Sequence, residues 1–186
     1  MDQTIKDDVG AGEKKNGQTG VDQIKKLGPL SRNIIPHILN LYCCAATGSD
    51  FEIYHPNATF EDFYMRAYGV KEIKSVFYSV PKIVSEGKIV EYSVKENETS
   101  PGCGEILIDN KQIYKFLGKT INMTTLIVLQ VENGKIIRHE DRWDVKPFMN
   151  RHTVSVPLLG RVAEGIRRCS VLMVHVMMGF GKDPTP

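Results

Sequence analysis

The chain has 186 residues, of which 41% are hydrophobic, enough for one domain with a sizeable core and polar extensions. Its 24 basic and 22 acidic residues leave a net charge of only +2, and this balance argues against a nucleic-acid-binding protein. The four cysteines have no CxxC spacing, so we expect reduced thiols, as in a cytosolic or nuclear protein.

The N-terminal segment is polar. Residues 1–27 are rich in Gly, Lys, Asp and Gln and contain almost no large apolar side chain before Ile24. Such a composition cannot bury enough surface to offset the entropy of ordering the backbone, so we expect a disordered tail. The segment also lacks the apolar stretch of a secretory signal, and we therefore expect a cytoplasmic protein.

Two helices and a short strand are predicted next. The apolar residues of "SRNIIPHILNLYCCAAT", residues 31–47, fall at helical spacing, and Pro36 is tolerable there if it lies in the first turn. A short strand over 58–63 precedes a second helix in "GVKEIKSVFYSVPKIV", residues 69–84, which Pro81 is expected to end.

Four β-type runs follow, over residues 88–95, 105–117, 122–131 and 135–144. The dipeptide Asn133-Gly134 predicts a tight hairpin between the last two runs, because both residues readily adopt positive φ. The order of elements predicts an α+β fold in which helices cover one face of a curved antiparallel sheet. We assign this domain to residues 28–148.

Residues 149–186 form a predicted C-terminal helical extension, with helices over 157–168 and 170–180. The second is apolar nearly all round but too short for a bilayer, which needs about 20 apolar residues. Two alternatives follow. The segment is either a core or dimer helix, or it lies flat at a membrane interface with Arg161, Arg167 and Arg168 contacting lipid headgroups.

Three stretches, "HPNATFED", "GVKEIKSVFYSV" and "ENGKIIRHEDRWD", together with the order of elements, resemble the nuclear transport factor 2-like superfamily. Its members include SnoaL-like polyketide cyclases, ketosteroid isomerases and scytalone dehydratase. The resemblance covers 31–144, and a plant branch also shares the C-terminal "MGFGKDP". It implies a cone: a strongly curved antiparallel sheet wrapped around N-terminal helices, with an apolar cavity at the open end. It also implies a homodimer through the outer sheet face.

The resemblance suggests residues for a site in this cavity. Strand alternation puts Phe60 and Asp62 on one face, and Asp62 matches the general base of the isomerase-like members. Tyr42 lies near the position of their oxyanion-binding tyrosine. Their second oxyanion donor is missing here, because the corresponding run offers only Thr124 or Thr125.

The last strand carries a second group of candidates. In "IIRHEDRWD", alternation places Ile137, His139, Asp141 and Trp143 on one face, which suits a ligand cavity, and the charged residues on a solvated face. His139 either forms a proton-transfer pair with Asp141 or Asp62, or hydrogen-bonds within the core while Trp143 packs under the helices.

Two functional hypotheses remain. The first is a cofactor-free enzyme that isomerises, cyclises or dehydrates a small hydrophobic metabolite, with catalytic residues Asp62, Tyr42 and His139. The second is an accessory protein of plant specialised, terpenoid-like metabolism. It binds such a metabolite or docks through 157–180 on a membrane-bound oxidase at the endoplasmic reticulum. In both, the expected ligand contacts are Phe60, Thr125, Asp141 and Trp143.

The incomplete catalytic set favours the accessory hypothesis. The spacing of the histidines and cysteines gives no metal-binding pattern, and the chain has no glycine-rich phosphate loop. We therefore expect neither a metal nor a cofactor.

Overall fold

The computed structural model describes residues 27–143 and 157–184. Its elements are, in chain order, α2 (Pro29–Tyr42), η1 (Gly48–Ile53), β1 (Tyr54–Glu61), β2 (Arg66–Tyr68), α3 (Val70–Ile83), β3 (Glu86–Ser100), β4 (Cys103–Phe116), β5 (Lys119–Glu132), β6 (Lys135–Trp143) and α4 (Pro157–Met177).

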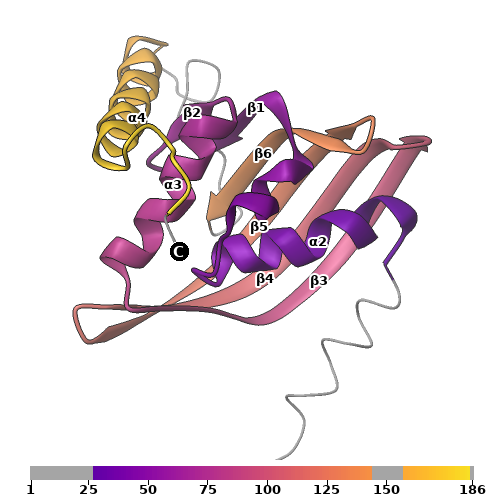
Figure 1. Cartoon of the computed structure of the whole chain (residues 1–186), viewed down its shortest axis with the longest axis horizontal. Helices are drawn as coiled ribbons and strands as arrows, with labels where there is room; N and C mark the ends of the chain where they lie inside the picture. The colour runs from indigo at the N-terminus through magenta and orange to yellow at the C-terminus, as the bar shows by residue number, and fades with distance from the viewer. Residues whose placement is uncertain (1–26, 144–156, 185–186) are drawn as a thin grey trace, which may run out of the picture.

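The strands form one curved sheet in the order β2-β1-β6-β5-β4-β3. Neighbouring strands are antiparallel except for β1 and β6, which are parallel. The long strands β3, β4 and β5 bend around α2, and α4 packs against α3 and β2 away from the long strands (Figure 1). The helix α3 meets the C-terminal end of α2, where Phe77 contacts Tyr42. The predicted α+β class with a curved sheet around helices is therefore confirmed.

Two-residue turns set the register of the long strands. Asn133 and Gly134 have φ of 51° and 72°, which confirms the predicted hairpin between β5 and β6. Leu117 and Gly118 have φ of 47° and 75° and join β4 to β5 in the same way. Because this second turn is so short, β5 begins at Lys119, before the predicted start at Asn122, whereas β4 ends at Phe116, one residue before its predicted end.

The start of α2 is capped from the sheet. The helix has no side-chain cap of its own, although Pro29 suits its first turn. The Glu96 carboxylate of β3 instead accepts hydrogen bonds from the backbone N–H groups of Leu30, at 3.3 Å, and Ser31, at 2.8 Å. A negative charge at this end also complements the helix dipole. Leu27, which the sequence analysis placed in the tail, is buried against the core.

Three helix predictions were wrong in detail. The second helix, α3, does not end at Pro81 but continues to Ile83. Pro36 lies beyond the first turn of α2, because the helix begins at Pro29. The two predicted C-terminal helices are one continuous helix, α4, because 168–171 contains no glycine or proline to interrupt it. In the stretches 27–143 and 157–184, no helix has both the length and the apolar character that a bilayer crossing would require.

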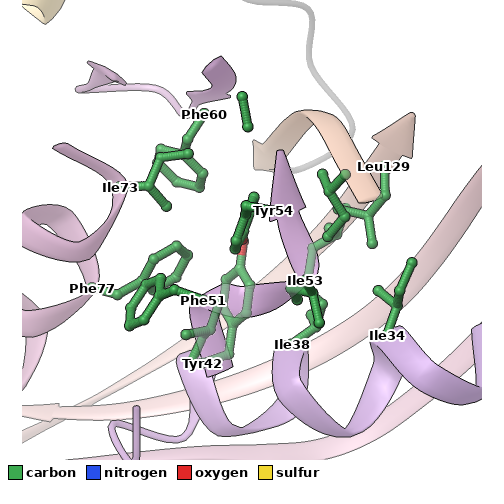
Figure 2. Close-up of a cluster of buried hydrophobic side chains, with 14 of the residues drawn as sticks. Ile34, Ile38, Tyr42, Phe51, Ile53, Tyr54, Phe60, Ile73, Phe77 and Leu129 are labelled. Atoms are coloured by element: carbon green, nitrogen blue, oxygen red, sulfur yellow. The ribbon is translucent and has the colours of Figure 1, made fainter. Parts of the chain in front are cut away.

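The core lies between α2, α3 and the concave face of the sheet. Its aromatic centre joins Tyr42 and Phe77 edge to face at 5.5 Å, and Phe51 and Tyr78 in the same way at 5.2 Å. Aliphatic side chains of α2 and β5 pack around this centre (Figure 2). The buried side chains therefore form one continuous core cluster, and Tyr42 belongs both to this cluster and to the cavity described below.

We expect Ile38→Ala to lower the free energy of unfolding by about 2–5 kcal/mol, because Ile38 is fully buried and its loss leaves a cavity. Val90→Ala is the matched control, since Val90 is 54% exposed, and its effect should stay within about 0.5 kcal/mol. Urea unfolding measures both. Equal effects would contradict this description of the core.

Candidate functional site

A cavity of about 510 Å³ opens between α2, α3 and the concave face of the sheet. Three polar side chains reach it: Asp62, Asp141 and Gln112. In the described part of the chain, no lysine, arginine or histidine lines it. The remaining lining is apolar or aromatic: Leu41, Tyr42, Phe60, Tyr64, Val76, Phe77, Val80, Ile83, Val84, Tyr114, Phe116, Ile121, Met123 and Trp143. Such a cavity suits a small hydrophobic molecule with few polar groups.

His139 lies behind the cavity wall, between two tyrosines. Its Nε2 is 3.1 Å from the hydroxyl of Tyr42, and its Nδ1 is 2.7 Å from the hydroxyl of Tyr54. The ring is fully buried and contacts Phe60 edge to face at 5.0 Å. Burial lowers the pKa of His139 to about 3, so the imidazole is neutral at physiological pH.

The number of donors and acceptors on each group decides which atoms of Tyr42, His139 and Tyr54 carry the protons. A neutral imidazole has one donor and one acceptor nitrogen. Tyr54 is buried, and among the described residues His139 is the only partner of its hydroxyl, which must therefore donate to Nδ1. Nε2 then carries the proton and donates to the oxygen of Tyr42. The Tyr42 hydroxyl keeps its own proton for an acceptor on the cavity side.

Of the two cavity carboxylates, Asp141 has the larger effect on the pKa of Tyr42. Trp143 donates from its indole nitrogen to Oδ2 of Asp141 at 3.2 Å. The hydroxyls of Tyr42 and Thr125 also lower the pKa of Asp141, but burial outweighs them and raises it to about 6. Within the described residues, Oδ1 of Asp141 has no hydrogen-bond partner of normal geometry, although it is buried. An unpartnered acidic oxygen on a cavity wall can receive a ligand group.

Asp62 is held by a tight turn after β1. Its Oδ1 accepts hydrogen bonds from the backbone N–H groups of Tyr64, at 2.7 Å, and Met65, at 2.5 Å. Burial, and then the charge of Asp141, raises the pKa of Asp62 to about 7 despite these bonds. Between the pKa values of about 6 and about 7, the two carboxyl groups together hold about one proton. One can then donate a proton while the other accepts one.

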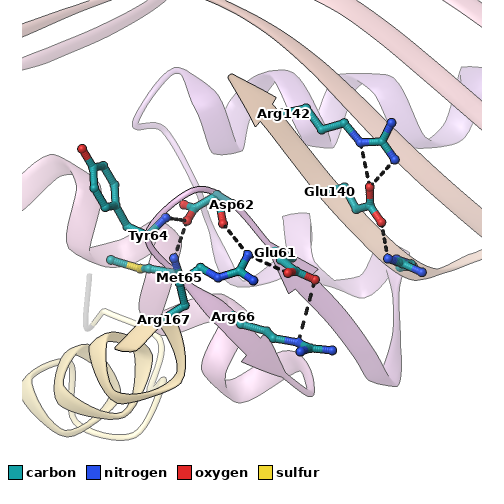
Figure 3. Close-up of polar contacts among 9 residues, drawn as sticks. Glu61, Asp62, Tyr64, Met65, Arg66, Glu140, Arg142 and Arg167 are labelled. Atoms are coloured by element: carbon teal, nitrogen blue, oxygen red, sulfur yellow. Dashed lines mark hydrogen bonds and ion pairs between the residues drawn. The ribbon is translucent and has the colours of Figure 1, made fainter. Parts of the chain in front are cut away.

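The back of the Asp62 turn is held by α4. Arg167 donates to Oε1 of Glu61 at 2.6 Å and to the backbone carbonyl of Asp62 at 3.3 Å (Figure 3). Arg168 forms a bidentate pair with Glu72 of α3. Of the two alternatives for this segment, headgroup contact by Arg167 and Arg168 is not what the structure shows, because both side chains bind carboxylates of the domain itself.

The remaining charged face of β6 is salt-bridged as expected. Glu140 is buried between Arg138 and Arg142, and Nε of Arg142 donates to it at 2.8 Å (Figure 3). Asp144, which the sequence placed on the same face, lies outside the described residues. A β-bulge opposite Gln130 and Val131 makes Ile136, rather than Ile137, the inward-facing residue near the start of β6.

The structure divides the predicted site residues into two groups. It brings Tyr42, Phe60, Asp62, Asp141 and Trp143 to the cavity wall.

His139 and Thr125 lie behind this wall. The predicted proton-transfer pair of His139 with a carboxylate is absent, because both ring nitrogens face tyrosines. Thr125 is fully buried and accepts hydrogen bonds from Asn110 and Gln112, each at 3.0 Å, so it is not free for a ligand.

The sequence analysis missed several residues that line the cavity or hold its walls in place. Gln112, Tyr114 and Phe116 also reach the cavity, and strand alternation along β4 would have grouped them. The contact of Tyr54 with His139 joins residues 85 positions apart, and that of Arg167 with Glu61 joins residues 106 positions apart. No local pattern indicates such pairs.

We expect His139→Gln to remove part of the acid sensitivity of the fold. The unfolded histidine has a pKa near 6.5, whereas the folded one has a pKa of about 3, so between these values only the unfolded state is protonated. Stability should therefore fall as pH falls from about 6.5 towards 3 in the wild type, by up to about 1 kcal/mol per pH unit more than in the variant.

Urea unfolding at four pH values between 4 and 7 measures this difference. The raised pKa values of Asp62 and Asp141 change the free energy of unfolding in the opposite sense. Their contribution to stability is lost as the pH rises through about 7 for Asp62 and about 6 for Asp141. They are present in both proteins and cancel in the comparison. Parallel pH profiles would contradict a neutral, buried His139.

Solved structures of other proteins have a similar fold. The chain superposes on a nuclear transport factor 2-like protein from Anabaena variabilis with a TM-score of 0.53 and 15% identity, over 67% of this chain and 91% of the other. It also superposes on a candidate polyketide cyclase from Xanthomonas campestris with a TM-score of 0.51 and 9% identity, over 62% and 91% of the two chains. The fold is therefore that of the nuclear transport factor 2-like proteins.

No protein-family model matches the sequence, and a comparison with curated proteins gives no match. The plant branch therefore stays a prediction.

Proposed function

We propose that the protein is a cofactor-free acid–base enzyme that moves a proton on a small hydrophobic carbonyl compound, in an isomerisation, cyclisation or dehydration. One observation carries the proposal: two carboxyl groups with raised pKa values share an apolar cavity with an oriented phenol. The solved structure of similar fold from Xanthomonas, a candidate polyketide cyclase, is compatible with this class of reaction.

Each group has a separate role in the reaction. Ionised Asp62 takes a proton from a carbon next to the substrate carbonyl, and the electron pair of the broken C–H bond moves onto the carbonyl oxygen. The Tyr42 hydroxyl donates a hydrogen bond to this developing oxyanion, and Asp141 donates a second one in the minority of molecules in which Asp141, rather than Asp62, holds the proton that the pair shares. Asp62 then returns the proton to another carbon, which completes an isomerisation. In a cyclisation, the same enolate attacks an electrophilic carbonyl carbon, and Asp62 gives its proton to the alkoxide that forms. In a dehydration, the enolate expels a β-hydroxyl group, which leaves as water with the proton from Asp62.

Asp141 supplies the second donor that the sequence analysis could not find in Thr124 or Thr125. Its burial keeps part of the population protonated near neutral pH, and a neutral carboxylic acid is a stronger donor than a hydroxyl. His139 acts indirectly, because it accepts from Tyr54 and donates to Tyr42 and so fixes the phenol. This set favours the enzyme over the accessory hypothesis.

Hydrogen–deuterium exchange tests the proposal without knowledge of the natural substrate. The wild type should speed the exchange of the α-protons of hydrophobic cyclic ketones, beginning with 2-phenylcyclohexanone, into D₂O. Asp62→Asn should lose roughly 10²-fold or more of this rate, because an amide cannot accept the proton. Proton NMR follows the exchange.

The matched control is Asp109→Asn, since Asp109 is an exposed carboxylate of β4 outside the cavity, and its rate should equal that of the wild type. Wild-type exchange no faster than buffer, or unchanged exchange in Asp62→Asn, would overturn the enzyme proposal.

A second function is favoured by the outer side of α4. This side exposes a row of large apolar residues: Val162, Ile166, Leu172, Met173, Val176, Met177 and, just beyond the helix, Phe180. Exposed apolar stripes of this kind are typical of docking surfaces. We propose as the alternative that the protein binds a small hydrophobic metabolite and docks through 157–180 on a membrane-bound oxidase of plant terpenoid-like metabolism. Homodimerisation through the outer sheet face remains a prediction.

Replacing Leu172, Val176 and Met177 with serine or glutamine should abolish co-sedimentation with microsomes, or co-purification with such an oxidase. The three side chains are 45%, 61% and 76% exposed, so the melting temperature should change by only a few degrees. Val171→Ser is the contrasting variant, because Val171 is fully buried and its change should destabilise the fold. Binding that survives the triple replacement would exclude this docking surface.

A further inference from the structure

Arg167 is bound to the residue pair that carries the cavity carboxylate. This residue is only 4% exposed, although it belongs to a helix of which no described residue lines the cavity. One guanidinium nitrogen contacts both Oε1 of Glu61 and the backbone carbonyl of Asp62. Figure 3 shows the guanidinium of Arg167 beside the turn that holds Asp62. The backbone of Asp62 is therefore fixed from α4.

The turn after β1 links the contact between Arg167 and the Asp62 carbonyl to the carboxylate of Asp62. The N–H of Asp62 donates to the carbonyl of Met65 at 3.0 Å, and the amides of Tyr64 and Met65 bind Oδ1 of Asp62. Backbone and carboxylate thus form one closed set of hydrogen bonds. A displacement of the Asp62 carbonyl would change the direction of its carboxylate as well, because the same short loop positions both.

Charged groups on four elements, β6, α4, β1 and β2, surround Asp62. Asp141 of β6 raises its pKa, whereas Arg167 of α4 lowers it. On β1, Glu61 faces Arg167 and also lies 3.8 Å from Nε of Arg66 of β2, so its charge is shared between two guanidinium groups. On α2, Tyr42 is neutral, because burial and then Asp141 raise its pKa well above the usual range. Arg167 is thus the cation that opposes Asp141 at this carboxylate.

We propose that Arg167 is a positioning residue that keeps Asp62 oriented and ready to accept a proton. This inference rests on the proposed role of Asp62 as the base. It makes α4 a functional part of the site and not only a cover for α3 and β2. It also links the exposed outer side of α4 to the cavity, because a partner that shifts the helix would shift Arg167.

Arg168 provides a matched control on the same helix. It also binds a carboxylate of the domain, since its Nη2 is 2.7 Å from Oε1 of Glu72, and its guanidinium lies 4.9 Å from the ring centre of Tyr68. It therefore fastens α4 to the domain as Arg167 does, but it makes no contact with Asp62. A purely structural role of the helix arginines would give Arg167 and Arg168 variants the same effect.

The experiment is a pH titration of the aspartate carboxyl carbons by ¹³C NMR, with the Asp62 signal assigned by its loss in Asp62→Asn. Arg167→Gln should raise the midpoint of Asp62 by about one pH unit, because it removes a nearby positive charge. Arg167→Lys should restore a midpoint near that of the wild type. Arg168→Leu should leave it unchanged. The signals of Asp62 and Asp141 are followed together, because the two groups titrate as a pair.

Ketone exchange gives the second readout. In Arg167→Gln the rate at pH 7 should fall about fivefold, which is the loss of ionised Asp62 for a one-unit shift, and it should recover above pH 9. If Arg167→Gln does not fold, Arg167→Leu replaces it. An unchanged Asp62 midpoint in a folded neutral variant, or an equal shift in Arg168→Leu, would overturn the inference. The titration needs no activity, so a shifted midpoint without any ketone exchange would reject the proposed base and retain the positioning contact.

Discussion

The hydrogen-bonded trio of Tyr54, His139 and Tyr42 is the constraint on which the rest of the site depends. It joins the start of β1, the middle of β6 and the end of α2 inside the core, where an unsatisfied polar group would cost about 1–3 kcal/mol. Because the imidazole is neutral and has one donor and one acceptor, it can satisfy both tyrosines only in one orientation. The phenol at the cavity wall is therefore fixed by the same bonds that hold the three elements together.

In the cavity next to this trio, Asp62 and Asp141 do not ionise independently, because they share one apolar environment. Burial raises both pKa values, and the charge of Asp141 raises that of Asp62 further. The backbone amides of Tyr64 and Met65 and the guanidinium of Arg167 limit the rise at Asp62. Among the described residues, the groups that lower the pKa of Asp141 are an indole and two hydroxyls rather than a cation. The proposed proton transfer thus follows from the different surroundings of Asp62 and Asp141, and ordinary aspartate side chains are sufficient for it.

Local patterns in the sequence were sufficient for the fold but only for part of the site. Apolar spacing located α2 and α3, and Asn133-Gly134 fixed a hairpin, because these signals depend on neighbours within a few residues. Alternation correctly grouped Asp141 and Trp143 on the concave face. It could not show that His139 would be enclosed by tyrosines, because that depends on which elements pack behind β6. For the same reason, the role of Asp141 beside Tyr42 became visible only in three dimensions.

The C-terminal helix connects the two functional hypotheses. Its inner side carries Arg167, which binds the turn of Asp62, and its outer side exposes the apolar row that ends near Phe180. Because α4 packs mainly on α3 and β2, it is attached to the cone without being part of the sheet. A partner bound to the outer side would act on the same rigid helix that holds Asp62. Docking and proton transfer would then be coupled, since withdrawal of Arg167 leaves Asp141 as the dominant charge at Asp62 and favours its protonated form.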